Sequence, residues 1–205
     1  MRNPLSLAIT ALLLAACSGG QPPASTDQPP AMAQTPAGPA AEHDTDEGHE
    51  HTGEEQVAIA RLQPTAGNQV SGELMIRRLG DRLQVTGNVS GLKAGAEHGF
   101  HIHEKGDCSA PDGSSAGGHF NPGSSEHGSI STAMHHGGDM PNITANAEGV
   151  ATIDAPVSSN VNIGKGDGFD IIGRGLIVHA DADDYKTQPT GNAGARLACA
   201  VIKAP

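Results

Sequence analysis

The sequence predicts an all-β fold, an antiparallel sandwich or barrel, and three observations favour it. Glycine and proline account for 28 and 14 of the 205 residues, which disfavours long packed helices. Short apolar runs alternate with polar residues at a spacing of two, the period of a strand with one buried face. Between two of these runs, Gly80-Asp81 is typical of a tight hairpin turn. These features together predict strands joined by loops.

The first element, residues 1–16, is typical of an export signal. Arg2 provides a positive start, and residues 5–14 form an apolar core that is shorter than the roughly 18 residues of a membrane-spanning helix. The stretch ends in Leu14-Ala15-Ala16-Cys17, which resembles the lipobox of bacterial lipoproteins. That resemblance implies cleavage before Cys17 and acylation of this cysteine. Ser18 follows this cysteine in place of the Asp that would alter sorting, so the resemblance to bacterial lipoproteins also implies the outer membrane. The alternative is an ordinary signal peptide with a cysteine near the cut.

The second element, residues 17–56, lacks a hydrophobic period and has the composition of a flexible tether. Within it, residues 42–51 interleave histidines with carboxylates, a pattern that binds copper or zinc weakly. The alternative is a solvated acidic linker. Residues 42–55 contain seven acidic and no basic residues, so the tether carries much of the net charge of −11. This negative charge argues against nucleic acid as a partner.

The third element, residues 57–205, is the folded domain. Strands are expected around the alternating apolar residues 74–76 and 83–89, and over residues 150–157, 170–179 and 197–202. Residues 104–142 have almost no apolar period and consist of Gly, Ser, Pro, His and Asp. A polar stretch of this length inside a domain is functional or else disordered, so we expect a site there.

Three cysteines leave one without a partner in an exported chain. If Cys17 is lipidated, Cys108 and Cys199 remain, and the periplasm is oxidising enough to join them. Such a crosslink closes a loop of about 90 residues and should stabilise the fold by roughly 4 kcal/mol in the chain-entropy description.

Histidines and one aspartate form the candidate site. His101 and His103 flank Ile102 at strand spacing, so both rings leave the same face, as half of a four-nitrogen site of the kind Cu(II) prefers. The polar stretch adds three imidazoles and a carboxylate, which would close a tetrahedral zinc site without a solvent ligand. The alternative is a set of structural histidines. The members of this second group are His119, His127, His136 and Asp139.

Three motifs carry a resemblance to a known family. Gly99-Phe100-His101-Ile102-His103, Gly118-His119-Phe120-Asn121-Pro122 and the stretch 191–199 (GNAGARLAC) resemble the signatures of copper/zinc superoxide dismutase, in an order that runs from about residue 57 to 202. The resemblance implies a Greek-key sandwich or barrel of about eight antiparallel strands with long metal-binding and disulfide loops. It also implies conversion of superoxide to dioxygen and hydrogen peroxide by alternating reduction and reoxidation of copper, with zinc as a structural metal.

The same resemblance assigns roles to single residues. A bridging imidazole, His119, belongs to both metal sites and delivers a proton towards peroxide, and Asp183 links a copper histidine, His101, to a zinc histidine, His127. Cys108 and Cys199 match the disulfide of the family. The implied copper ligands are His101, His103, His119 and His179, and the implied zinc ligands are His119, His127, His136 and Asp139.

Two further residues match the substrate channel of the family. Arg196 corresponds to the residue that attracts and orients the superoxide anion, with a structural loop anchor as the alternative. Thr190 corresponds to the residue that narrows the channel, with a simple turn hydroxyl as the alternative. Two other histidines are not expected to be ligands: His98 is expected to be structural, and His135 to be an exposed loop residue.

The function expected is superoxide dismutation outside the cytoplasm, by a periplasmic protein held to a bacterial membrane through Cys17. A non-catalytic copper/zinc-binding lipoprotein on the same fold is the alternative. The expected substrate is superoxide. The short segment 184–190 and the long stretch between Cys108 and His119 resemble the bacterial periplasmic class of the family, and this resemblance implies a homodimer of the bacterial type. A purely structural lipoprotein would not explain histidines at all of the ligand positions.

Overall fold

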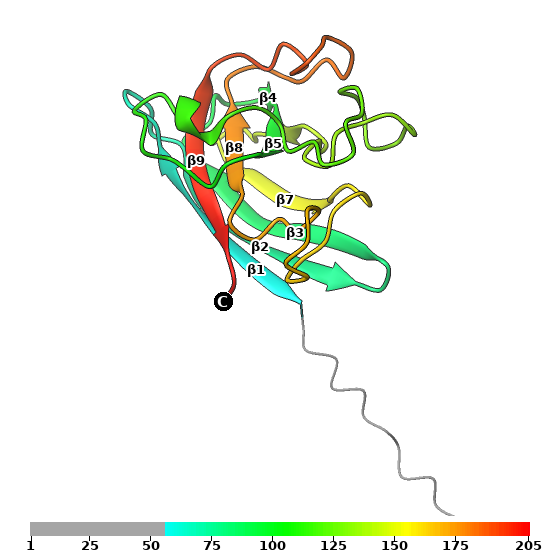
Figure 1. Cartoon of the computed structure of the whole chain (residues 1–205). Coiled ribbons are helices and arrows are strands. Elements are labelled where there is room, and N and C mark those ends of the chain that lie inside the picture. Colours follow the sequence, from blue (N-terminus) through cyan, green and yellow to red (C-terminus); the bar gives the residue numbers. More distant parts are fainter. Residues whose placement is uncertain (1–55) are drawn as a thin grey trace, which may run out of the picture. The chain divides into compact units, whose positions relative to one another are not determined.

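One curled antiparallel sheet dominates the computed structural model, which describes residues 56–205 (Figure 1). The strands are β1 (Val57–Pro64), β2 (Ser71–Leu79), β3 (Arg82–Ser90), β4 (Glu97–His98), β5 (Phe100–His103), β6 (Ile143–Thr144), β7 (Ala151–Pro156), β8 (Gly175–His179) and β9 (Arg196–Lys203). These nine strands are close to the predicted number of about eight.

Seven strands are hydrogen-bonded in the order β5-β8-β9-β1-β2-β3-β7, and β4 pairs separately with β6. The consecutive strands β1, β2 and β3 are flanked by β9 and β7, which follow much later in the chain. This non-sequential order is Greek-key connectivity and confirms the predicted fold class. Within residues 56–205 the helical structure is a 3-10 turn at Ser114–Ala116, and no helix there is long and apolar enough to cross a membrane.

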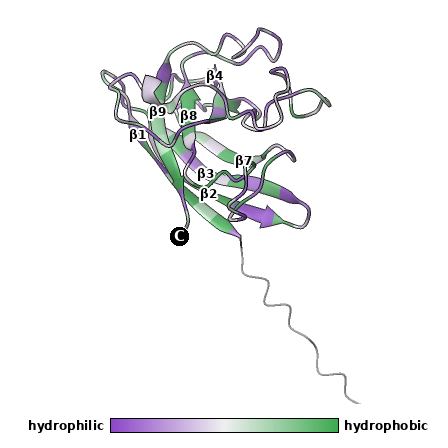
Figure 2. Ribbon diagram, viewed as in Figure 1, coloured by the Kyte–Doolittle hydropathy of each residue, from purple (hydrophilic) through white to green (hydrophobic). Residues whose placement is uncertain are grey.

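Alternation along the strands builds the core. On β2, Leu74 and Ile76 are fully buried, whereas Met75 between them is 42% exposed. Leu79 pairs with Arg82 across a two-residue turn in which Gly80 has a φ of 61°, as the sequence predicts for this hairpin. In Figure 2 hydrophobic residues colour much of β1, β8 and β9. Each large side chain buried in this core contributes about 1.5–3 kcal/mol.

The strand expected over residues 170–179 is shorter than predicted, since it begins only at Gly175. The carboxylate of Asp170 accepts hydrogen bonds from the backbone N–H groups of Gly164, Gly166 and Ile172. These bonds hold the chain in a loop up to that point. The apolar residues before Gly175 therefore pack against the core from a loop and not from a strand.

The long loops gather at one end of the sheet. Figure 1 shows the β5–β6 loop and the β8–β9 loop together at the upper end, with the C terminus at the other. A disulfide between Cys108 and Cys199 ties the β5–β6 loop to β9, across 91 positions of sequence, and confirms the predicted pairing. Ala116 and Ile177 pack around it in a small cluster of their own.

Removing the disulfide tests its contribution. We expect Cys108→Ser with Cys199→Ser to lower the free energy of unfolding by roughly 4 kcal/mol, because the unfolded chain regains the entropy of a long loop. Urea unfolding of the metal-free protein measures this, with Cys17→Ser in both chains so that no free thiol differs. A loss below about 1 kcal/mol would contradict the entropic account.

Candidate metal centre

Strand β5 has two faces with different chemistry. Phe100 and Ile102 are fully buried in the apolar core. His101 and His103 alternate with them and therefore leave the opposite face. They are also buried, with exposed fractions of 0% and 1%, so the loops must cover this second face. The pattern creates a closed polar region beside the core.

The β5–β6 loop packs directly on that strand. The N–H of Phe120 donates to the carbonyl of Ile102 at 2.8 Å, and the N–H of Ile102 donates to the carbonyl of Gly138 at 2.9 Å. A side chain at position 138 would collide with the Ile102 carbonyl oxygen, so only glycine allows this approach. The contact places His119 beside His103, with which it forms an isolated bridge.

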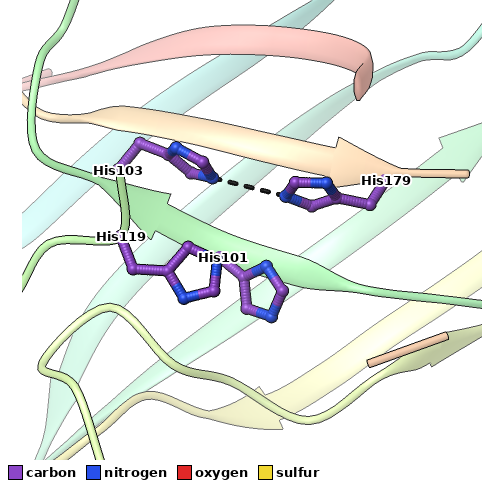
Figure 3. Close-up of side chains that lie close together, drawn as sticks. All are labelled: His101, His103, His119 and His179. Carbon is purple, nitrogen blue, oxygen red and sulfur yellow. Dashed lines mark hydrogen bonds between the residues drawn. The ribbon is translucent and has the colours of Figure 1, made fainter. Parts of the chain in front are cut away.

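Four imidazoles form the first cluster, which we call the copper cluster (Figure 3). His101 and His103 come from β5, His179 from the end of β8, and His119 from the loop. Their ligand nitrogens all lie within 4.8 Å of one another. The rings of His101 and His119 are 4.0 Å apart between centroids.

Hydrogen bonds on the outer side of each ring fix which nitrogen faces inward. Nδ1 of His103 faces the carbonyl of Gly117 at 2.9 Å, and Nδ1 of His179 faces the carbonyl of Gly194 at 3.3 Å. Carbonyl oxygens require N–H donors, so the Nε2 atoms of both rings carry lone pairs. These two atoms face each other at 3.3 Å. The facing lone pairs are compatible only with a cation or a proton between or beside them.

Two more nitrogens of the cluster lack any partner. Among the described residues, Nδ1 of His101 and Nε2 of His119 are buried without a hydrogen bond. An unpaired buried nitrogen costs about 1–3 kcal/mol. Four inward nitrogens without donors are the set that Cu(II) prefers, so the residues fit copper.

The second cluster, which we call the zinc cluster, is arranged around Asp139. Its Oδ1 lies 2.9 Å from Nδ1 of His119, 3.0 Å from Nδ1 of His127 and 3.4 Å from Nδ1 of His136. Its Oδ2 accepts the N–H groups of Gly128 and His136, at 3.0 and 2.8 Å, which fixes the orientation of the carboxylate. Three imidazoles and one carboxylate fit a closed tetrahedral zinc site. His119 faces this cluster with Nδ1 and the copper cluster with Nε2.

Asp183 joins the two clusters from outside. One oxygen accepts Nε2–H of His101 at 2.7 Å, and the other accepts Nε2–H of His127 at 2.9 Å. Each ring must therefore present Nδ1 inward. Gly191, at a φ of 64°, lies against this contact, and a Cβ there would overlap the carboxylate of Asp183.

Comparison with known proteins decides what this arrangement represents. Residues 70–202 match the copper/zinc superoxide dismutase family. The chain belongs to this family. The relatives include "Superoxide dismutase [Cu-Zn] 2" of Aquifex aeolicus, 38% identical over 149 residues, which are 71% of this chain and 86% of the relative. They also include "Superoxide dismutase [Cu-Zn]" of Caulobacter vibrioides, 46% identical over 52% of this chain and 63% of the relative.

A solved structure agrees with the sequence relatives of this chain. The crystal structure of a SOD-like protein from Bacillus subtilis is 39% identical and has a TM-score of 0.61. The match covers 70% of this chain and 96% of that protein. Copper and zinc are the metals that the family implies, and the two donor sets described above suit them.

The buried environment of the two clusters prepares their histidines for metal. Burial lowers the pKa of His119 to about 4 and that of His179 to about 3, and it holds the pKa of His103 well below its usual range. Neighbouring imidazoles add to the effect. Neutral rings keep the lone pairs that a metal needs.

His127 behaves in the opposite way. Burial acts to lower its pKa, but the hydrogen bonds and charges of Asp139 and Asp183 outweigh burial and raise it to about 9. The pKa values of both carboxyl groups fall below their usual range, because the imidazoles that donate to them outweigh burial. In the metal-free protein His127 is therefore protonated at neutral pH.

Arg196, the predicted anion guide, is half-buried at the start of β9. Its guanidinium donates to the carbonyls of Gly113 and Gly117, each at 2.6 Å, so it anchors the disulfide loop as the alternative interpretation expects. The carbonyl of Gly117 also faces Nδ1 of His103, so the guanidinium lies beside the copper cluster. Thr190 is half-buried in the β8–β9 loop, where its carbonyl accepts the N–H of Ala193 at 3.4 Å.

The two other histidines of the domain are both buried. Nδ1 of His98 lies 2.8 Å from the carbonyl of His179, a structural contact. The expectation of an exposed His135 is wrong, because its exposed fraction is only 5%. Its Nδ1 contacts the carbonyl of Thr132 at 2.8 Å and its Nε2 the hydroxyl of Ser158 at 3.0 Å, away from the zinc cluster. Loop residues have no period from which burial could be predicted.

Removing Asp139 tests the zinc cluster. We expect Asp139→Ala to abolish stoichiometric zinc binding, because the variant loses one zinc ligand. Copper should be retained more loosely, because the variant also loses the carboxylate that accepts the N–H groups of Gly128 and His136 and so orders the loop. Metal analysis after dialysis measures both metals. Asp154→Ala, on the surface of β7, is the control. A full complement of zinc in Asp139→Ala would contradict the assignment.

The metal-free protein should lose stability as the pH falls from about 6.5 towards 4. His119 and His179 have folded pKa values below the unfolded value, so the unfolded chain binds more protons in this range. Each group contributes a loss of up to about 1.4 kcal/mol per pH unit. His127, with its raised pKa, adds no loss here, because it is protonated in the folded chain throughout.

Urea unfolding of the metal-free chain at pH 7 and pH 5 measures this slope. The metal-loaded protein, in which these nitrogens are occupied, is the comparison and should vary less over the same range. A metal-free stability that is the same at both pH values would contradict the assigned protonation states.

Proposed function

We propose that this protein dismutates superoxide to dioxygen and hydrogen peroxide outside the cytoplasm. The observation that carries the proposal is the shared imidazole: in a member of this family, His119 belongs to two complete and buried donor sets. Bound copper would supply a reversible one-electron couple there, and bound zinc a fixed charge without redox chemistry. The relatives named superoxide dismutase support superoxide as the substrate.

The residues divide the remaining tasks between them. Two superoxide anions and two protons give dioxygen and hydrogen peroxide, so a proton must be held near the copper cluster. Nε2 of His119 is the atom we assign to this task, because it is buried, unpaired and directed into that cluster. Arg196 attracts and orients the anion, since its guanidinium contacts the same carbonyl, that of Gly117, as His103 of the copper cluster. Thr190 limits access from the neighbouring loop.

Asp183 keeps both sets aligned, as the outer hydrogen-bond partner that histidine ligands require. The zinc cluster consists of four residues of the β5–β6 loop, and zinc bound there would hold this loop together. The four residues are His119, His127, His136 and Asp139. A closed site of this type is structural, so its contribution is to fix the position of the shared ring.

We also propose that residues 1–16 direct export, that Cys17 carries the lipid and that residues 17–56 tether the domain of residues 57–205. The lipobox resemblance supports this, and it favours a periplasmic protein on the outer membrane. These predictions fall on or begin in residues 1–55, which lie outside the described part of the chain. A homodimer of the bacterial type stays a prediction, which sedimentation equilibrium of the full chain would test.

The activity test compares dismutation by the full-length Cys17→Ser chain, loaded with copper and zinc, with and without cyanide. We expect fast turnover that cyanide inhibits, since cyanide competes for an open copper position. No turnover despite one bound copper per chain would favour the alternative, a metal-binding lipoprotein on the same fold.

The role of Arg196 can be separated from its anchoring contacts. We expect Arg196→Ala to lower the dismutation rate about tenfold and to flatten its dependence on ionic strength, because electrostatic steering is screened by salt. Arg196→Lys keeps the charge and should keep the salt dependence. Lys203→Ala, at the far end of β9, is the control. If Arg196→Ala changed neither the rate nor its dependence on ionic strength, Arg196 would have no role in guiding superoxide and would serve only to anchor the disulfide loop.

A further inference from the structure

Gln188 makes an unusual contact with the zinc cluster from outside it. Its Oε1 accepts the N–H of His127 at 2.9 Å, and its Nε2 donates to the carbonyl of the same residue, also at 2.9 Å. One amide thus binds both backbone groups of a zinc-cluster residue. Gln188 comes from the β8–β9 loop, 61 positions away in sequence.

Asn142, at the end of the β5–β6 loop, makes the same type of contact with the backbone of Asp183 in the β8–β9 loop. Its Oδ1 accepts the N–H of Asp183 at 2.9 Å, and its Nδ2 donates to the carbonyl of Asp183 at 2.9 Å. The hydroxyl of Tyr185 in turn accepts the N–H of Asn142 at 2.7 Å. Each of the two loops therefore supplies one amide side chain to the backbone of the other.

The residues held in this way are themselves in contact. His127 and Asp183 are joined by their side chains at 2.9 Å, and each has its backbone fixed by an amide from the partner loop. The position of the His127 ring depends on its backbone, because its Nδ1 must also reach Asp139 at 3.0 Å. Loss of the Gln188 amide would free the two backbone groups of His127, whereas the other zinc-cluster residues would keep their contacts.

We propose that Gln188 is a positioning residue for the zinc site: it orients His127, and so the β8–β9 loop determines how firmly zinc is held. The inference rests on the proposed zinc site and extends it to a residue that touches no metal. Outer partners of metal ligands commonly change metal affinity by 10- to 100-fold when they are removed. Gln188 fixes the backbone of His127, whereas the carboxylate of Asp183 fixes its ring.

The test uses the full-length Cys17→Ser chain with both metals bound. We expect Gln188→Ala to transfer zinc to a chromogenic chelator about tenfold faster, with copper content unchanged. Cobalt(II) bound in place of zinc gives a second readout, because its visible spectrum reports the ligand geometry. We expect this spectrum to change in the variant.

Asn192→Gly is the matched control. Asn192 lies in the same loop, and its amide binds only within that loop, to Asp184 and Thr187. Its φ of 53° suits glycine, so the variant loses two hydrogen bonds without backbone strain. Zinc release from this control should match that of the parent chain.

A second variant keeps the test decisive if Gln188→Ala does not fold. Gln188→Glu retains an acceptor for the N–H of His127 and loses the donor to its carbonyl, so we expect an intermediate rate of zinc release. Release from the Gln188 variants at the rate of Asn192→Gly, with an unchanged cobalt spectrum, would overturn the inference alone. A parent chain that binds no zinc would overturn it together with the proposed function.

Discussion

The carboxylate of Asp183 is the constraint on which the metal centre depends. It accepts one N–H from His101, in the copper cluster, and one from His127, in the zinc cluster, so a single group fixes the orientation of both rings. The same constraint explains the glycine at position 191, where any side chain would occupy the space of this carboxylate. The copper cluster and the zinc cluster are thereby held in place by the same carboxylate.

The fold supplies that frame through strand alternation and through two covering loops. On β5, one set of side chains completes the apolar core and the other set becomes ligands. The disulfide fixes the β5–β6 loop to β9, and the carbonyl of Gly117 in that loop accepts hydrogen bonds from both His103 and Arg196. The copper cluster, Arg196 and the disulfide are consequently connected through the β5–β6 loop.

The sequence alone predicts much of this. Alternation locates the hairpin around Gly80, spacing places His101 and His103 on one face, and the polar stretch 104–142 marks the loop that covers them. The length of β8 was overestimated, because the side chain of Asp170 competes for backbone donors, which apolar patterning does not register. Gln188 and Asn142 could not be found in this way. Their contacts join loops 41 and 61 positions apart, and such side-chain-to-backbone bonds leave no period in the sequence.

A crystal structure of the metal-loaded chain, with anomalous data at the copper and zinc edges, would locate both metals. We expect one copper peak against His101, His103, His119 and His179, and one zinc peak against His127, His136 and Asp139. The ring of His119 should lie between them, with Nε2 towards copper and Nδ1 towards zinc. A single metal peak, or copper within the Asp139 cluster, would contradict these assignments.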